Sequence, residues 1–196
     1  MIIGIDVGMR IENPSAYVVL DGMQDAPGWI VAYGEMAPAI KGTKTNWLDR
    51  CCQVADHAGA VVAAYVATGG RIDAIVVERP YVEKSVDVAI KLATLQGMLF
   101  LACRSYAPQA LLIQAQPQDG KQALTGDRRA DKQAMQQMAA RVGLRAACSS
   151  HEADALGIAL YGYGAWKVQC QLMQRDPTAV PQAPLRRSPS PRSSRG

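Results

Sequence analysis

The chain opens with Met1–Val7, MIIGIDV, which predicts a short buried β-strand that ends in an acid, Asp6. A continuous apolar run of this length is typical of a strand that is covered on both faces. The pattern returns at Ile72–Glu78, IDAIVVE, where a second apolar run ends in a carboxylate. Two such strands indicate an α/β protein with acidic side chains at its strand ends.

The rest of the chain supplies elements of the same class. Further strands are expected over Ala16–Leu20, Gly28–Glu35 and Leu111–Ala115. Helices are expected over Trp47–Thr68, Ser85–Arg104, Asp131–Val142 and His151–Leu172. Three opening strands followed by helix–strand alternation predict an α/β layer architecture, with a mixed five-stranded sheet flanked by helices.

Length and composition predict one globular domain. The chain has 196 residues, of which 49% are hydrophobic and 19% are charged. We expect no membrane span, because no apolar run approaches the roughly 18 residues that one needs. The opening MIIGID has no positively charged region of a secretory signal, and the five cysteines are scattered. These features predict a protein of the reducing cytoplasm.

The net charge of +4 lies at the C-terminal end. The segment Arg175–Gly196 contains five Arg and one Asp, so residues 1–174 are neutral overall. The same segment has five Pro and four Ser, a composition that predicts a disordered tail after a folded domain of residues 1–174. The tail is either a solvated extension or a basic arm that adds phosphate contacts.

The two strand-end acids raise a question of function. A carboxylate at a crowded strand end is unfavourable unless it is solvated, hydrogen-bonded or bound to a cation. Each alone has an ordinary explanation: Asp6 as a turn-forming side chain before Gly8, and Glu78 as the ion-pair partner of Arg79. Together they are more informative, because both follow compact β runs whose carboxyl ends can converge.

The segment Ser149–Tyr161, SSHEADALGIALY, places a His, a Glu and an Asp before an apolar helix. Ser149 followed by Glu152 is a capping box, which explains Glu152 without a functional role. His151 and Asp154 are three residues apart and share one helix face. With the two strand-end acids they form a candidate divalent-metal site. Oxygen ligands favour Mg²⁺ or Mn²⁺, and one imidazole favours Mn²⁺.

These residues lie in stretches that resemble the RuvC-type Holliday-junction resolvases of the ribonuclease H-like (retroviral integrase) superfamily. The first stretch is IIGIDVG, whose Asp6 matches the first catalytic carboxylate of that family. The second is Ala74–Gly97, AIVVERPYVEKSVDVAIKLATLQG. Its Glu78 matches the second carboxylate, and Tyr81 takes the place of an aromatic residue near the junction centre.

Two further stretches follow in the family's order. Gly120–Val142, GKQALTGDRRADKQAMQQMAARV, contains Lys121 and Lys132, which match two basic positions near the family's site. In HEADALGIALYG, Asp154 matches the last carboxylate, and His151 matches a position that is Asp in many members and His in some. The resemblance spans nearly all of residues 1–165 and implies a ribonuclease H-like fold.

The resemblance also implies an activity. It is that of a metal-dependent endodeoxyribonuclease that resolves four-way junctions in DNA recombination and repair, leaving a 5′-phosphate and a 3′-hydroxyl. Two Mg²⁺ or Mn²⁺ ions about 4 Å apart would straddle the scissile phosphate. Lys121 or Lys132 would offset the developing charge. The ligands would be Asp6, Glu78, His151 and Asp154.

The substrate has consequences for assembly. A four-way junction is two-fold symmetric, so we expect a homodimer that makes paired nicks. The helix that begins near Ser85 is apolar enough to form the dimer seam, although its Met and Leu residues also suit a core. The sequence identifies no partner helicase.

Contacts to branched DNA are expected from basic and aromatic side chains. Tyr81 is a candidate for stacking on an exposed base, or else a half-buried tyrosine after a Pro turn. For each basic residue the alternative is a solvated surface charge. The basic candidates are Arg79, Lys84, Lys91, Arg128 and Arg129.

The chain departs from the family pattern after its first acid. The pattern is close to GxxxTG, whereas the loop from Gly8 to Ala16 is longer and lacks the second glycine, with Ser15 in place of the threonine. This departure and the basic tail are typical of a diverged member, such as one from a phage or prophage. They bear on junction selectivity more than on the chemistry.

Three other functions fit parts of the sequence. One is a broader endonuclease of the same fold that cuts forks and flaps. A non-catalytic junction-binding protein is disfavoured because all four candidate ligands are present. An actin/hexokinase-like phosphotransferase also begins with an apolar GIDxG strand, but it needs two such domains and glycine-rich phosphate loops that this chain lacks.

Overall fold

The computed structural model describes residues 1–9, 14–22, 29–37, 46–80 and 85–175. Five strands and five helices are described within these ranges. In chain order they are β1 (Ile2–Met9), β2 (Pro14–Leu20), β3 (Ile30–Met36), α1 (Trp47–Ala67), β4 (Ala74–Glu78), α2 (Val86–Tyr106), β5 (Leu111–Ala115), α3 (Pro117–Thr125), α4 (Lys132–Arg141) and α5 (Ser150–Arg175).

The strands form one mixed sheet in the order β3-β2-β1-β4-β5. The meander of the first three strands is antiparallel, and β4 and β5 extend the sheet in parallel. The long crossovers through α1 and α2 make the parallel pairings possible. The predicted mixed five-stranded sheet flanked by helices is therefore confirmed.

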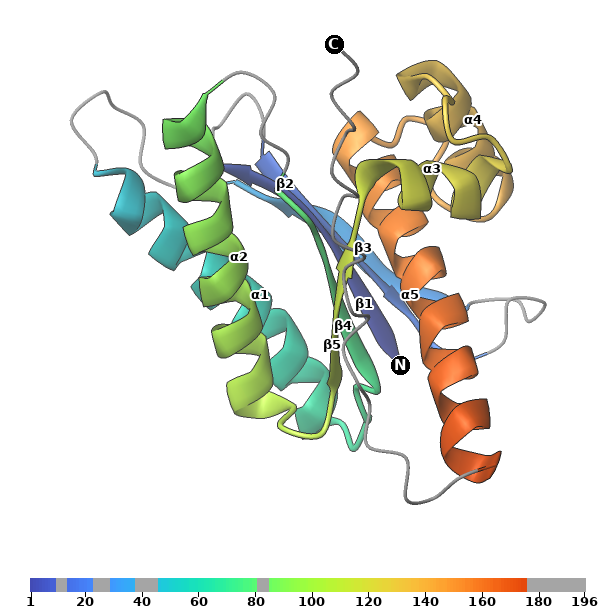
Figure 1. The fold of residues 1–196 in the computed structure, drawn as a ribbon, viewed down its shortest axis with the longest axis horizontal. Coiled ribbons are helices and arrows are strands. Elements are labelled where there is room, and N and C mark those ends of the chain that lie inside the picture. Colours follow the sequence, from blue (N-terminus) through green and yellow to red (C-terminus); the bar gives the residue numbers. More distant parts are fainter. Residues whose placement is uncertain (10–13, 23–28, 38–45, 81–84, 176–196) are drawn as a thin grey trace, which may run out of the picture.

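Helices cover both faces of the sheet, as Figure 1 shows. On one face α1 and α2 pack over Ile3, Ile5 and Val77. On the other face α5 crosses the sheet, with α3 and α4 beside its N-terminal end, over Val18 and Val76. Alternate residues of β1 and β4 thus contribute to two separate cores, which is why these strands read as unbroken apolar runs.

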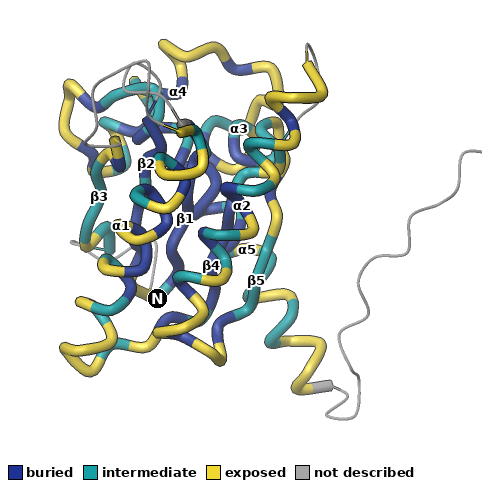
Figure 2. Tube along the Cα trace, turned by 90° about the vertical axis from the view of Figure 1, so that its left-hand side faces the viewer, coloured by how far each residue is buried: buried dark blue, intermediate teal, exposed yellow. Residues whose placement is uncertain are grey.

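The central strands are the most buried part of the molecule (Figure 2). Helix α5 lies unusually close to β1, because a Cβ added at Gly4 would come within 2.6 Å of the carbonyl oxygen of Ala155. The glycine of the opening GID motif is therefore required by packing against α5. This close approach brings the first turn of α5 toward the end of the β1–β4 pairing.

Helix α2 is more apolar than we expected. By length and composition it is the one helix within the described ranges that could cross a membrane, although little of it is buried. One side of α2 packs on α1 and the sheet, which accounts for its apolar residues there. On another side, Val86, Ile90 and Leu101 are exposed. Leu101 is 74% exposed.

All nine elements predicted from the sequence are present, with ends that differ by a few residues. Helix α3 was not predicted, although Pro117 at its first position and Gly126 at its C-cap are ordinary boundary signals. The predicted disordered tail begins at the last residue of α5. Its residues 176–196 lie outside the described ranges.

Candidate active site

The pairing of β1 with β4 places two acids side by side. Ile5 pairs with Val77 as the last parallel pair, so Asp6 and Glu78 come next on adjacent strands. Because side chains alternate along a strand, both acids point to the face that α5 covers. Asp6 lies inside β1, which runs on to Met9, so the prediction that it ends the strand was wrong.

The first turn of α5 faces these acids. The predicted capping box is confirmed: the Ser149 N–H donates to Glu152 Oε2 at 2.8 Å, and the Glu152 N–H donates to Ser149 Oγ at 3.1 Å. This cap fixes the start of the helix and leaves His151 and Asp154 on another face. His151 Nδ1 lies 2.7 Å from Asp6 Oδ2.

These contacts rule out the simpler explanations of the two strand-end acids. Asp6 is 6% exposed and bonds across the fold to α5, so it is not a turn-forming side chain. Glu78 makes no ion pair with Arg79 among the described residues. The Arg79 side chain is exposed, and its backbone N–H donates to the carbonyl oxygen of Ala115 at 2.7 Å.

Crowding of negative charge perturbs the titration of the site. Burial first, and then the charge of Asp6 and a hydrogen bond with it, raise the pKa of Glu78 to about 10. Burial and the charge of Asp6 raise the pKa of Asp154 to about 6. The hydrogen bond to Asp6 also raises the pKa of His151. Burial and neighbouring negative charge therefore disfavour the ionised forms of Glu78 and Asp154.

The donor chemistry of this cluster suits a divalent cation. Carboxylate oxygens with one imidazole are ligands for Mg²⁺ or Mn²⁺, and a cation would relieve the repulsion among buried acids. Among the described residues, no three His, Cys, Asp or Glu side chains already surround one ion position. In this arrangement Asp6 Oδ2 is instead engaged by His151 Nδ1 at 2.7 Å.

Two lysines flank the cluster. Lys121 on α3 lines a cavity of about 40 Å³ together with Glu78 and Asp154. Lys132, the first residue of α4, is exposed. Its positive charge partly opposes the rise in the pKa of both His151 and Asp154. Helix α3 brings Lys121 to the cavity by packing closely on α5, where Gly120 approaches the backbone of the helix.

The other predicted DNA contacts divide into three groups. Tyr81 and Lys84 lie outside the described residues. Lys91 is paired with Asp87 one turn away, and Arg128 is paired with Asp119 at 3.1 Å, which favours a structural surface role for both. Arg79 and Arg129 are exposed and have no ion pair within the described ranges.

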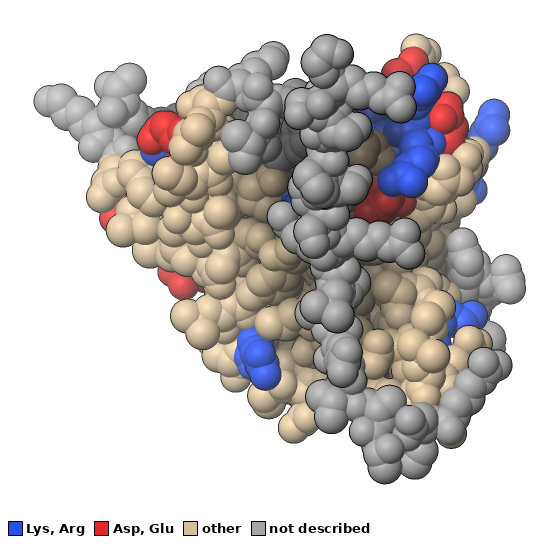
Figure 3. Space-filling view, viewed as in Figure 1, with Lys and Arg blue, Asp and Glu red and all other residues tan. Residues whose placement is uncertain are grey.

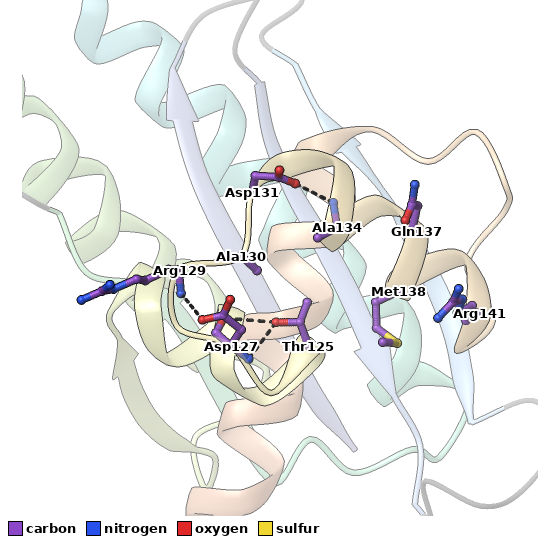
Figure 4. A pocket seen from close by; sticks show the side chains of 9 residues that line it. All are labelled: Thr125, Asp127, Arg129, Ala130, Asp131, Ala134, Gln137, Met138 and Arg141. Carbon is purple, nitrogen blue, oxygen red and sulfur yellow. Dashed lines mark hydrogen bonds between the residues drawn. The ribbon is translucent and has the colours of Figure 1, made fainter.

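Figure 4 shows the surroundings of Arg129, a surface hollow between α3 and α4. Its acids already have structural partners: Asp127 accepts from the Arg129 backbone N–H, and Asp131 caps α4. Arg129 and Arg141 lie on opposite sides of the hollow rather than converging on one point. The hollow is thus built around the connection between the two helices.

Sequence reasoning missed residues that support the cluster from behind. Gln96 of α2 is 5% exposed and donates to the backbone carbonyl of Glu78 at 2.8 Å, and Gln114 donates to Gln96 at 3.0 Å. Arg145 donates to both carboxylate oxygens of Glu152, at 2.8 and 3.0 Å. A polar Gln between apolar helix positions was the available signal for Gln96. No comparable signal in the sequence pointed to Arg145, because its contact with Glu152 depends on the conformation of the loop before α5.

Comparisons with known proteins identify the family and the fold. Residues 2–161 match the family model described as crossover junction endodeoxyribonuclease RuvC. A crossover junction endodeoxyribonuclease RuvC from Gloeobacter violaceus is 29% identical over 164 residues, which cover 83% of this chain and 87% of that protein.

Two solved structures share the fold. The Thermus thermophilus RuvC structure superposes with a TM-score of 0.62 at 21% identity and covers 87% of this chain and 96% of its own. T. thermophilus RuvC in complex with a Holliday junction substrate superposes with a TM-score of 0.62 at 24% identity, covering 87% and 95%.

Proposed function

The chain belongs to the RuvC family of crossover junction endodeoxyribonucleases, and from that premise we propose how its own residues resolve a four-way DNA junction. Enzymes of this family are divalent-metal-dependent nucleases. The observation that carries the proposal is the meeting of Asp6 with His151 across 145 positions of sequence, beside Glu78 and Asp154.

In this proposal, Asp6, Glu78, His151 and Asp154 hold Mg²⁺ or Mn²⁺ at the end of the β1–β4 pairing. Bound divalent cations supply an activated water and charge stabilisation for the leaving 3′ oxygen. The chain itself supplies rigid placement: two ligands come from adjacent strands and two from one face of α5. Asp6 is the best candidate for a shared ligand, because it already interacts with both Glu78 and His151.

Lys121 and Lys132 take the role of balancing charge on the scissile phosphate. Lys121 borders the same small cavity as Glu78 and Asp154, and Lys132 acts electrostatically on His151 and Asp154. A lysine is suited to this role because its ammonium group is a compact charge on a flexible stem. The products are a 5′-phosphate and a 3′-hydroxyl.

We propose that two copies associate through α2. The residues Val86, Ile90, Ala93, Gly97 and Leu101 follow helical spacing and are all exposed. In Figure 3 the surface over α2 carries few charged side chains, whereas charged groups gather over α3 and α4. An isologous contact along this stripe would give one active site per subunit and paired nicks across a two-fold symmetric junction.

Branched DNA would lie against the face that carries the acids. Arg79 and Arg129 are the proposed phosphate contacts within the described residues, and Tyr81 and Lys84 are proposed from sequence alone. The basic segment after residue 174 is proposed as a further phosphate-binding arm, separate from the catalytic domain. We propose that the enzyme acts on DNA in the cytoplasm.

Cleavage of a labelled synthetic four-way junction tests the proposal. Wild type and Asp6→Asn are compared in Mg²⁺ and in Mn²⁺, with matched fork and flap substrates beside the junction. Paired symmetric nicks, confined to the junction and lost in the variant, are the expected result. Equal cutting of forks and flaps would favour the broader branched-DNA endonuclease. Junction binding without cleavage in either ion would favour the non-catalytic alternative.

A further inference from the structure

Glu152 is a buried acid that lies between His151 and Asp154 in sequence but does not face the cluster. It is 1% exposed, and its two carboxylate oxygens accept three hydrogen bonds. One comes from the backbone of Ser149, and two come from the guanidinium of Arg145. Because both oxygens are occupied and the side chain points about 100° away from that of His151 around the helix, Glu152 is not placed to be a metal ligand.

Arg145 connects this buried acid to the edge of the sheet. Its guanidinium lies 5.9 Å from the centre of the Tyr33 ring on β3, while one guanidinium nitrogen, Nη2, donates to both carboxylate oxygens of Glu152. The side chain is 59% exposed, so the contact is half at the surface. The loop before α5, the first turn of α5 and strand β3 are thus held together by one arginine.

This arrangement bears on the geometry of the cluster. His151 is the residue before Glu152, and Asp154 is the second residue after it, so all three are in the first turns of one helix. Arg145 Nη2 donates to both oxygens of Glu152 while the guanidinium lies over Tyr33, so the position of the Glu152 carboxylate is restricted relative to β3. Any rotation of the first turn of α5 that moves His151 away from Asp6 must also distort the bonds to Glu152.

We propose that Arg145 and Glu152 are positioning residues, which set the orientation of the first turn of α5 and so present His151 and Asp154 to the acids of β1 and β4. This inference rests on the proposed function, in which the cluster binds divalent metal ions for DNA cleavage. The capping box alone orients the backbone of α5 locally. Arg145 connects the helix to β3, because it contacts both Glu152 and Tyr33. The competing role for Arg145 is a direct contact to a DNA phosphate, since its side chain is partly exposed.

Three substitutions separate the two roles. Arg145→Lys keeps the positive charge but replaces the planar guanidinium, which contacts Glu152 through Nη2 while lying over Tyr33, by a single ammonium group. Arg145→Gln removes the charge, and Glu152→Gln keeps the size of the side chain while removing its charge. Arg141→Gln is the matched control, because Arg141 is an exposed arginine four positions earlier with no contact to Glu152. Circular dichroism and thermal melting verify that each variant is folded.

The readouts are the single-turnover cleavage rate at saturating junction, the junction Kd without divalent ions, and the affinity for Mn²⁺ alone. Loss of a residue that orients metal ligands typically lowers activity or metal affinity about 10- to 100-fold. We expect such a loss for Arg145→Lys and Arg145→Gln, with an unchanged Kd. In the Glu152→Gln background, Arg145→Gln should add little, because both changes break one contact.

Other outcomes overturn the inference. If Arg145→Lys behaves as wild type while Arg145→Gln raises the junction Kd, the arginine is a DNA contact. Wild-type cleavage and Mn²⁺ affinity in all variants would show that the contact does not position the ligands. If wild type cuts no junction, the proposed function fails instead, and the Mn²⁺ affinities still decide the positioning role. Should Glu152→Gln not fold, the two Arg145 variants decide it.

Discussion

Replacing Asp154 by asparagine is expected to stabilise the metal-free protein while abolishing cleavage. Burial, and then the charge of Asp6, raise the pKa of Asp154 from 3.8 to about 6. A carboxyl group whose pKa is higher in the folded state stabilises the fold below its ordinary pKa. That contribution is lost as the pH rises through about 6. Above that pH the ionised Asp154 destabilises the fold unless a cation is bound.

The size of the effect follows from the pKa. A rise of about two pKa units corresponds to about 3 kcal/mol, at about 1.4 kcal/mol for each unit. The attraction of His151, Lys121 and Lys132 for ionised Asp154, which lowers its pKa, is already contained in this figure. We therefore expect a gain of up to about 3 kcal/mol at pH 8. For a chain of this length, that gain raises Tm by several degrees, at about 2–4 °C per kcal/mol.

Urea unfolding in a chelator, at pH 4.5 and at pH 8, measures this gain. Asp56→Asn is the control, because Asp56 is an exposed acid on α1, which covers the opposite face of the sheet. The gain from Asp154→Asn should be small at pH 4.5 and larger at pH 8, and added Mn²⁺ should stabilise wild type more than the variant. A variant no more stable than wild type at pH 8 without metal would refute this account of the cluster.

Three further predictions concern the scaffold. Gly4→Ala should lower the free energy of unfolding by about 2 kcal/mol or more, because the new Cβ meets the backbone of α5 near Ala155; unchanged urea unfolding would contradict this packing. Ser149→Ala should lower it by about 1 kcal/mol through loss of the cap, whereas Ser149→Thr, the control, should change it little. Leu101→Glu should make the protein monomeric in sedimentation and abolish paired but not single nicks, while a dimer that persists would exclude α2 as the seam.

Local patterns in the sequence were enough to predict most of the elements and the cap of the helix that carries His151 and Asp154. The capping box of Ser149 and Glu152 was predicted because both bonds form within four residues. The apolar runs before Asp6 and Glu78 indicated buried strands, because each strand faces a core on both sides. Helix α3 was missed despite its Pro and Gly boundary residues, because it has only 9 residues and most of them are polar.

The site itself depends on distances that no local pattern contains. Asp6 and Glu78 are neighbours only through the register of β1 and β4, and Asp6 meets His151 only because Gly4 lets α5 cross β1 closely. The same holds for charges. Arg128 was a plausible DNA contact in sequence, but folding pairs it with Asp119. Lys91 differs, because its partner Asp87 lies one helical turn away on α2 and could have been predicted from the sequence.

Arg145 shows the difference most clearly. In sequence it is one of several arginines in a polar stretch, and Glu152 is already explained by its cap. Only the folded loop brings the guanidinium onto both oxygens of Glu152 and over the ring of Tyr33. Strands, helices and caps were readable from the sequence because they form among residues a few positions apart. The candidate metal-binding cluster and its support were decided by the tertiary structure, because a buried charge takes its partner from whatever chain segment packs against it.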